Sequence, residues 1–91
     1  MRLNLDKSII DLRGNPQKEN LSDVLADILA TSSTHRPAQT IAWAYDLIKN
    51  GEIEVSQTDL EFIKSIISRN PNFTDLAKAQ LLEEIDKLLK E

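Results

Sequence analysis

The sequence predicts a small, mostly helical α+β domain, with about four helices packed with a small two- or three-stranded sheet. Apolar and polar residues alternate near the N-terminus and again over residues 52–55, which is the period of a strand. Elsewhere apolar residues recur every three or four positions, which is the period of a helix. We therefore expect the N-terminus to pair with residues 52–55, and residues 1–91 to form a single domain.

The first twenty residues have the pattern of extended chain followed by a turn and a loop. Residues 14–16, Gly-Asn-Pro, supply turn chemistry, because Gly takes a positive φ and Pro fixes its own φ. The polar residues 17–20 predict a loop. The inward positions expected from the alternation are Leu3 and Leu5 in a first segment, and Ile10 and Leu12 in a second.

Two helices are predicted between residues 20 and 51. The first has a cap at Asn20 or Ser22, and the second begins near Pro37 and ends at Gly51, which suits a left-handed cap. Trp43 lies about 120° from the centre of the second helix's apolar stripe, so the pattern does not bury it. The apolar residues are Leu21, Val24, Leu25, Ile28 and Leu29 in the first helix, and Ile41, Ala44, Tyr45 and Ile48 in the second, with Leu47 beside them.

A short strand and two more helices follow. Ile53 and Val55 alternate with acidic residues, which predicts a strand with both apolar side chains inward. Ser56, with Asp59 three residues later, resembles a capping box, and Thr74 or Asn72 caps the last helix. The apolar faces are Leu60, Ile63, Ile66 and Ile67 in the third helix, with Phe62 at the edge, and Ala77, Leu81, Leu82, Ile85, Leu88 and Leu89 in the fourth.

Composition narrows the class of protein. The chain has 91 residues, no Cys and a formal net charge of −4 at pH 7. This acidic balance argues against general electrostatic binding of nucleic acid or anionic lipid. No apolar run approaches the roughly 20 residues of a membrane helix, and the first residues lack the apolar core of a signal peptide. We expect a cytoplasmic protein without a nucleic-acid or membrane partner.

Groups suited to catalysis or metal binding are few. His35 is the only imidazole, and it lies in a Ser/Thr-rich loop, so with no Cys the usual zinc ligands cannot be assembled. Asp23 and Asp27, one helical turn apart, are better explained as a solvated face than as a cation site. Two Gly residues are too few for a Gly-rich phosphate loop. We predict no catalytic residue, no metal site and no cofactor, and hence a protein that is not an enzyme.

Trp43 carries the leading functional prediction. One interpretation is an aromatic that seals the edge of the core, and the other is a partner contact, because exposed Trp is enriched in interface hot spots. An apolar side chain rimmed by polar groups such as Gln39 and Asp46 suits a partner site. We predict that Trp43 and Leu47 border the principal contact surface, with Phe62 a weaker third member. The predicted function is a non-enzymatic protein-interaction module that binds a protein partner or self-associates.

A small acidic transcriptional or nucleic-acid regulator is the alternative. The second and third helices superficially resemble a helix-turn-helix, but residues 52–54 insert a strand where a turn of about three to four residues belongs. Asp59 and Glu61 near the start of the third helix would also repel phosphate. A regulator should show a coherent patch of basic residues. In this chain the basic residues are instead scattered among acidic ones, at Arg2, Lys7, Arg13, Lys18 and Arg36.

Three segments resemble a known group of proteins. They are residues 11–15 (Asp-Leu-Arg-Gly-Asn), 42–44 (Ala-Trp-Ala) and 76–82 (Leu-Ala-Lys-Ala-Gln-Leu-Leu). Together they resemble small proteins of unknown role encoded in tailed bacteriophages and prophages, which share a short β start, a Gly-Asn-like turn and this helix order. The resemblance implies a phage accessory or assembly protein made in a bacterial or phage-infected cytoplasm, with association with the virion left open. It defines no functional residues.

Overall fold

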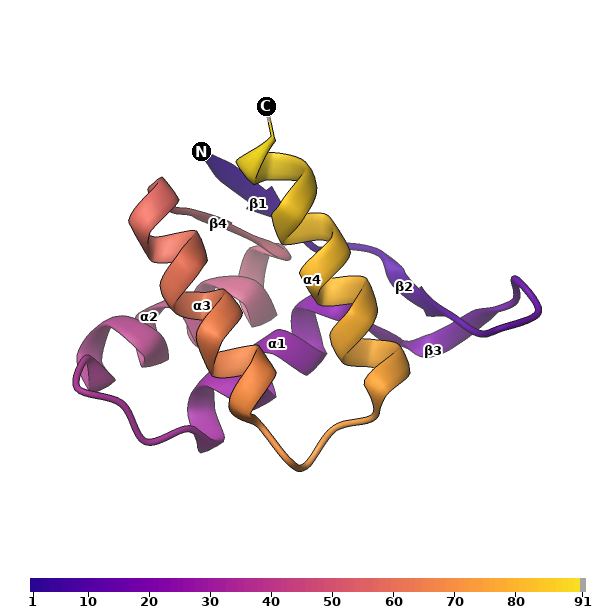
Figure 1. The fold of residues 1–91 in the computed structure, drawn as a ribbon, viewed down its shortest axis with the longest axis horizontal. Helices are drawn as coiled ribbons and strands as arrows, with labels where there is room; N and C mark the ends of the chain where they lie inside the picture. The colour runs from indigo at the N-terminus through magenta and orange to yellow at the C-terminus, as the bar shows by residue number, and fades with distance from the viewer. Residues whose placement is uncertain (91) are drawn as a thin grey trace.

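The fold consists of four helices and two short antiparallel sheets within residues 1–90, the part of the chain that the computed structural model describes. Figure 1 shows α3 and α4 in front of α1 and α2, so that the helices form two layers. The mostly helical α+β fold predicted from the sequence is confirmed. In chain order the elements are β1 (Arg2–Asn4), β2 (Ser8–Ile10), β3 (Pro16–Asn20), α1 (Leu21–Thr31), α2 (Pro37–Asn50), β4 (Glu52–Glu54), α3 (Gln57–Arg69) and α4 (Asp75–Leu89).

The predicted pairing of the N-terminus with the strand after α2 is confirmed. β1 and β4 are antiparallel, and Leu3 lies opposite Ile53. Both side chains are buried, because residues directly opposite each other in a strand pair lie on the same face of the sheet and this face meets the helices. Beyond β4, the Val55 N–H donates to the Met1 carbonyl at 2.7 Å, and the Val55 side chain is buried as predicted.

β2 and β3 form a second sheet, and here two sequence predictions are wrong. Residues 17–20, expected as a loop, belong to β3, which pairs antiparallel with β2. Ile9 is the buried residue of β2, whereas Ile10 and Leu12, expected inward, are 40% and 94% exposed. The physical reason is that Ile9 and Ile10 are adjacent apolar residues on opposite faces of the strand, so their pattern does not determine which one meets the core, and Ile9 is in phase with the buried Leu3 and Leu5.

The β2–β3 hairpin is held at its tip and along one edge. Figure 1 shows it extending away from the helices. At the tip, the Asp11 carboxylate accepts hydrogen bonds from the N–H groups of Asn15 and Arg13, which hold the pKa of Asp11 below its usual value. Along β2, the Gln80 side chain of α4 accepts from the Ile10 N–H at 3.0 Å and donates to the Ile10 carbonyl at 2.5 Å. A side chain therefore occupies this edge in place of a third strand.

α1 is the central helix, because it contacts the other three. Its predicted apolar face is confirmed. The five buried residues of that face are Leu21, Val24, Leu25, Ile28 and Leu29. Beyond the last turn, the Ser32 hydroxyl donates to the Ile28 carbonyl at 2.6 Å, which satisfies an acceptor that the helix itself leaves unpaired.

α3 and α4 begin at the predicted caps. The Ser56 hydroxyl accepts from the Asp59 N–H and the Asp59 carboxylate accepts from the Ser56 N–H, each at 3.1 Å, so the capping box is complete. At the start of α4, the Thr74 hydroxyl accepts from the Ala77 N–H at 3.3 Å. Both helices therefore start where short-range side-chain hydrogen bonds can satisfy their first N–H groups.

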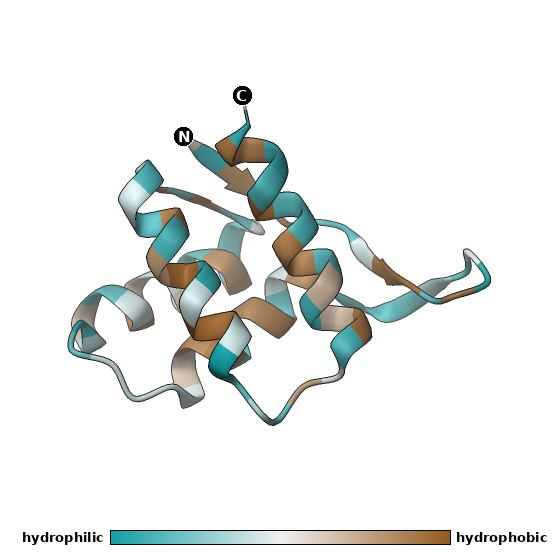
Figure 2. Ribbon diagram, viewed as in Figure 1, coloured by the Kyte–Doolittle hydropathy of each residue, from teal (hydrophilic) through white to brown (hydrophobic). Residues whose placement is uncertain are grey.

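The inward faces of α3 and α4 complete the core. Figure 2 shows hydrophobic and hydrophilic residues alternating along both helices, as expected for helices that bury one face. An ion pair of 2.8 Å between Lys64 and Asp86 joins them on the outside. The predicted core residues are buried at Leu60, Ile63, Ile66 and Ile67 in α3 and at Ala77, Leu81 and Ile85 in α4, whereas Leu82, Leu88 and Leu89 are partly buried.

Candidate protein-interaction surface

α2 packs its inward face against α1 and runs between the predicted boundaries. Its start at Pro37 is confirmed, and its end is capped by Gly51, whose φ of 75° is left-handed and whose N–H donates to the Leu47 carbonyl at 2.9 Å. Thr40 is buried on the inward face because its hydroxyl donates to the Pro37 carbonyl at 3.1 Å. The buried residues of α2 are Thr40, Trp43, Ala44 and Leu47.

The Arg36 guanidinium and the Phe62 ring form a cluster with Trp43. The Arg36 guanidinium lies 5.5 Å from the centre of the Trp43 ring and 4.7 Å from the centre of the Phe62 ring. It also forms a 3.0 Å ion pair with Asp59 at the start of α3. The rings of Trp43 and Phe62 lie 6.3 Å apart, and His35 packs edge-on against Phe62 at 5.5 Å. This cluster joins the start of α2 to α3 and covers Trp43.

The contact surface predicted at Trp43, Leu47 and Phe62 is wrong for its first two members. Trp43 is 3% exposed and Leu47 is 1% exposed, so both belong to the core. Phe62 is partly buried, with Arg36 over its ring. The physical reason is that α2 carries two apolar stripes, and helical periodicity locates stripes without determining which one meets the rest of the domain.

The second apolar stripe of α2 faces outward. Ile41, Tyr45 and Ile48, which the sequence pattern assigned to the core, are 36%, 72% and 61% exposed. Their spacing of four and three residues places them on one side of the helix. We call these three residues the α2 outer face. The sequence shows these three residues as an apolar stripe at helical spacing, but that pattern wrongly predicts that the stripe faces the core.

Little charge borders the α2 outer face. Asp46 and Lys49 are the charged residues of α2, one acidic and one basic, and both are exposed. Ala38 and Ala42 are also exposed and add apolar surface beside the outer face. The protein as a whole carries a net charge of −4. By helical periodicity Lys49 lies beside the α2 outer face, whereas Asp46 lies about 100° round the helix from Tyr45, so the α2 outer face is an apolar strip on an acidic molecule.

Leu12, at the tip of the β2–β3 hairpin, is a separate exposed apolar residue. Its side chain is 94% exposed. Figure 1 places the hairpin and α2 at opposite ends of the molecule, so Leu12 does not extend the α2 outer face. This separation makes Leu12 a suitable control position.

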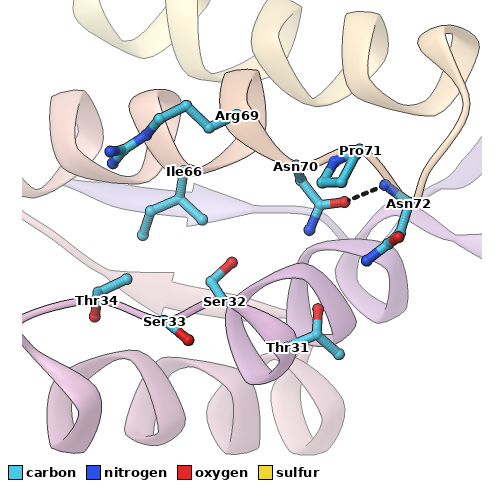
Figure 3. Close-up of a pocket in the computed structure, with 9 residues that line it drawn as sticks. All are labelled: Thr31, Ser32, Ser33, Thr34, Ile66, Arg69, Asn70, Pro71 and Asn72. Carbon is cyan, nitrogen blue, oxygen red and sulfur yellow. Dashed lines mark hydrogen bonds between the residues drawn. The ribbon is translucent and has the colours of Figure 1, made fainter.

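A polar pocket of about 300 Å³ lies where the α1–α2 loop meets the α3–α4 loop (Figure 3). Its polar groups serve the loops themselves: the Thr34 hydroxyl accepts a backbone N–H at 3.1 Å, and the Asn70 side-chain oxygen accepts from the Asn72 N–H at 2.8 Å. Arg69 folds back and donates to the Ser65 carbonyl at 3.3 Å. Among the described residues, its lining includes no carboxylate or imidazole to act as an acid or base.

The connection between α2 and α3 differs from that of a helix-turn-helix. β4 lies between the two helices and is paired with β1, so the connection is a strand and not a short turn. Several basic side chains also form ion pairs with acidic residues, which reduces the positive charge available to bind phosphate. The basic side chains in ion pairs include Arg2, Lys7, Arg36, Lys64 and Lys87.

Within residues 1–90, no group of three or more His, Asp or Glu side chains is arranged to hold a metal ion. Asp23 and Asp27 are exposed on α1, on the side where the sequence placed them. No helix in this part of the chain combines the length and apolar character needed to cross a bilayer. Comparisons with protein families, curated proteins and solved structures gave no match.

Proposed function

We propose that this protein is a non-enzymatic protein-interaction module that binds a protein partner through the α2 outer face. The observation that supports the proposal is the exposure of three large apolar side chains, Ile41, Tyr45 and Ile48, along one side of a single helix. Single exposed apolar residues are normal on a soluble protein, but apolar residues gathered in one patch mark interaction sites.

The composition of the α2 outer face fits a protein partner. Tyr is among the residues enriched at interface hot spots, because it adds a large apolar area and a hydroxyl that can form a hydrogen bond. Lys49 borders the strip as polar rim residues do in protein interfaces. An apolar helix face of this kind engages a partner by the helix-in-groove or helix-on-helix modes.

The cellular setting of this module is a separate proposal. The resemblance of residues 11–15, 42–44 and 76–82 to phage and prophage proteins points to an accessory or assembly protein in a bacterial cytoplasm. In that setting the α2 outer face would join the protein to another component by binding and without chemistry.

Site-specific photocrosslinking tests the proposed function. A photoreactive aromatic amino acid replaces Tyr45 in the full chain, and the matched control carries it at Leu12, which is also apolar and 94% exposed. In cells that produce the protein, we expect covalent adducts from position 45 and not from position 12. Adding Ile48→Ser to the position 45 chain should remove the adduct, because it lowers the apolar area of the same strip. Equal adducts at both positions, or none at position 45, would overturn the proposal.

A further inference from the structure

Residues 50–51, at the end of α2, form the only Asn-Gly sequence in the chain. Each of the other Asn residues precedes Leu, Phe or Pro. An Asn side chain loses its amide fastest when Gly follows, because Gly has no Cβ to hinder attack by its own backbone nitrogen. Asn is accordingly among the thermolabile residues of proteins. The chain therefore carries one site of favoured spontaneous deamidation, at the junction between α2 and β4.

Deamidation at this junction proceeds through a cyclic imide. The Gly51 nitrogen attacks Cγ of Asn50, the Cγ–NH2 bond breaks, and the proton of the Gly51 amide leaves with that nitrogen as ammonia. Water then opens the ring in one of two ways. Cleavage at Cγ gives aspartate at position 50. Cleavage at the backbone carbonyl gives isoaspartate, in which the backbone runs through Cβ and Cγ and is longer by one atom.

The folded backbone holds the two reacting groups apart. The imide ring requires Cβ of Asn50 and the Gly51 nitrogen to be nearly eclipsed about the Cα–C bond. Asn50 is the last residue of α2. A helical ψ of about −42° leaves these two atoms roughly 80° from eclipsed. The Gly51 N–H also donates to the Leu47 carbonyl at 2.9 Å, so it points back along the helix.

Contacts on the other side of the junction oppose the rotation that ring closure needs. The Leu5 N–H donates to the Gly51 carbonyl at 2.8 Å, and β4 begins at the next residue, paired with β1 (Figure 1). Gly51 is buried, and Asp6 fills the space beside its Cα, where a Cβ would lie 2.8 Å from the Cβ of Asp6. Rotation about ψ of Asn50 would break these contacts, so the ring closes only after the junction opens.

We propose that Asn50 and Gly51 form a deamidation site that the folded protein keeps closed and that reacts when the junction opens. Isoaspartate at position 50 then weakens the junction permanently. The longer backbone cannot satisfy both the Gly51 cap of α2 and the register of β4 with β1. The modification thereby converts a transient opening into a lasting loss of stability. This inference goes beyond the proposed function and does not use the α2 outer face.

Peptide mapping by mass spectrometry measures the rate of deamidation in the full chain. The chain is incubated in one mildly alkaline buffer, with and without enough urea to unfold it. We expect deamidation at Asn50 to be at least about tenfold slower in the folded chain, because a minor open state is populated at about 10% or less. Asn50→Gln, at an exposed position, is the control. Its longer side chain would need a larger ring, so the product at position 50 should fall to background in both conditions.

Urea unfolding of the separated products tests the effect on the junction. The chain is modified in urea and refolded, and chromatography separates the aspartate and isoaspartate forms. Asn50→Asp is the matched control, because it adds the same charge without lengthening the backbone. We expect the isoaspartate form to have an unfolding midpoint roughly 1 M urea below that of Asn50→Asp, because it loses two backbone hydrogen bonds of Gly51.

Each result bears on one part of the proposal. Equal rates in the folded and unfolded chains would overturn the protection by the junction. Product at another Asn in urea, with none at Asn50, would overturn the assignment of the site. An isoaspartate form as stable as Asn50→Asp would overturn the effect on the junction. The slow rate in the folded chain, the faster rate in urea and the lower midpoint together would support the proposal.

Discussion

Replacing Trp43 by Ala tests the packing of α2 most directly. The side chain is 3% exposed, and its ring lies against Arg36 and Phe62. A buried Trp→Ala change costs about 3–5 kcal/mol, because apolar contact is lost and a cavity remains. The aromatic pair and the cation over the ring each add about 0.5–1 kcal/mol, which places the expected loss toward the upper end of that range.

This loss is large compared with the total stability expected for the domain. At about 0.05–0.15 kcal/mol per residue, a chain of 91 residues has a free energy of unfolding of about 5–14 kcal/mol. Trp43→Ala should therefore remove a third or more of it. The midpoint of thermal unfolding should fall by about 12 °C or more, since 1 kcal/mol corresponds to about 4–8 °C in a domain of this size.

Urea unfolding, monitored by far-UV circular dichroism, measures the loss in free energy of unfolding. Circular dichroism is needed because the variant lacks the only Trp and so has no tryptophan fluorescence. Tyr45→Ala is the matched control on the same helix. Its side chain is 72% exposed, so we expect a change within about 0.5 kcal/mol. If Tyr45→Ala lowers the free energy of unfolding as much as Trp43→Ala does, the assignment of the inward stripe is wrong.

Two further predictions concern a backbone position and a carboxylate. A Cβ at Gly51, where φ is 75°, would lie 2.8 Å from the Cβ of Asp6, so Gly51→Ala should lower the free energy of unfolding by about 1–3 kcal/mol in urea titrations. Gly14→Ala, at φ 88° with open space around it, should cost less, and equal losses would contradict the close approach. The Ser56 N–H, and then the Arg36 guanidinium, hold the pKa of Asp59 below its usual 3.8. The ionised Asp59 carboxylate therefore stabilises the folded protein above that pH, and this stabilisation is lost as the pH falls through the lower pKa of the folded state. Asp59→Asn should flatten the fall in stability below about pH 4, and an unchanged slope would refute this account.

Local signals in the sequence determine the boundaries of most elements. The capping box of Ser56 and Asp59, the Thr74 cap and the Gly51 end of α2 each involve residues within a turn or two of one another, so the chain itself contains the whole interaction. The inward faces of α1 and α3 are predictable for a related reason. Each of these helices carries a single apolar stripe, and it is the one that can be buried.

The inward side of β2 was not predictable in this way. Its buried residue is Ile9, in phase with Leu3 and Leu5, and the adjacent Ile10 on the opposite face has the same apolar character, so the pattern alone could not choose between them. β3 was missed because Gln17, Lys18 and Glu19 are exposed polar residues, and they form a strand through backbone pairing with β2. Strand formation at an exposed edge depends on a neighbouring strand and leaves little trace in side-chain hydrophobicity.

The candidate surface was decided by the tertiary structure. By itself the sequence determined that α2 is a helix from Pro37 to Asn50 with apolar residues on two sides. Which side of α2 meets the core depends on which side the rest of the chain can cover. Arg36 and Phe62 cover Trp43, and α1 packs against the inward face of α2. The remaining stripe, with Tyr45 at its centre, stays exposed, because burial is a property of neighbouring surfaces and periodicity within one helix does not encode it.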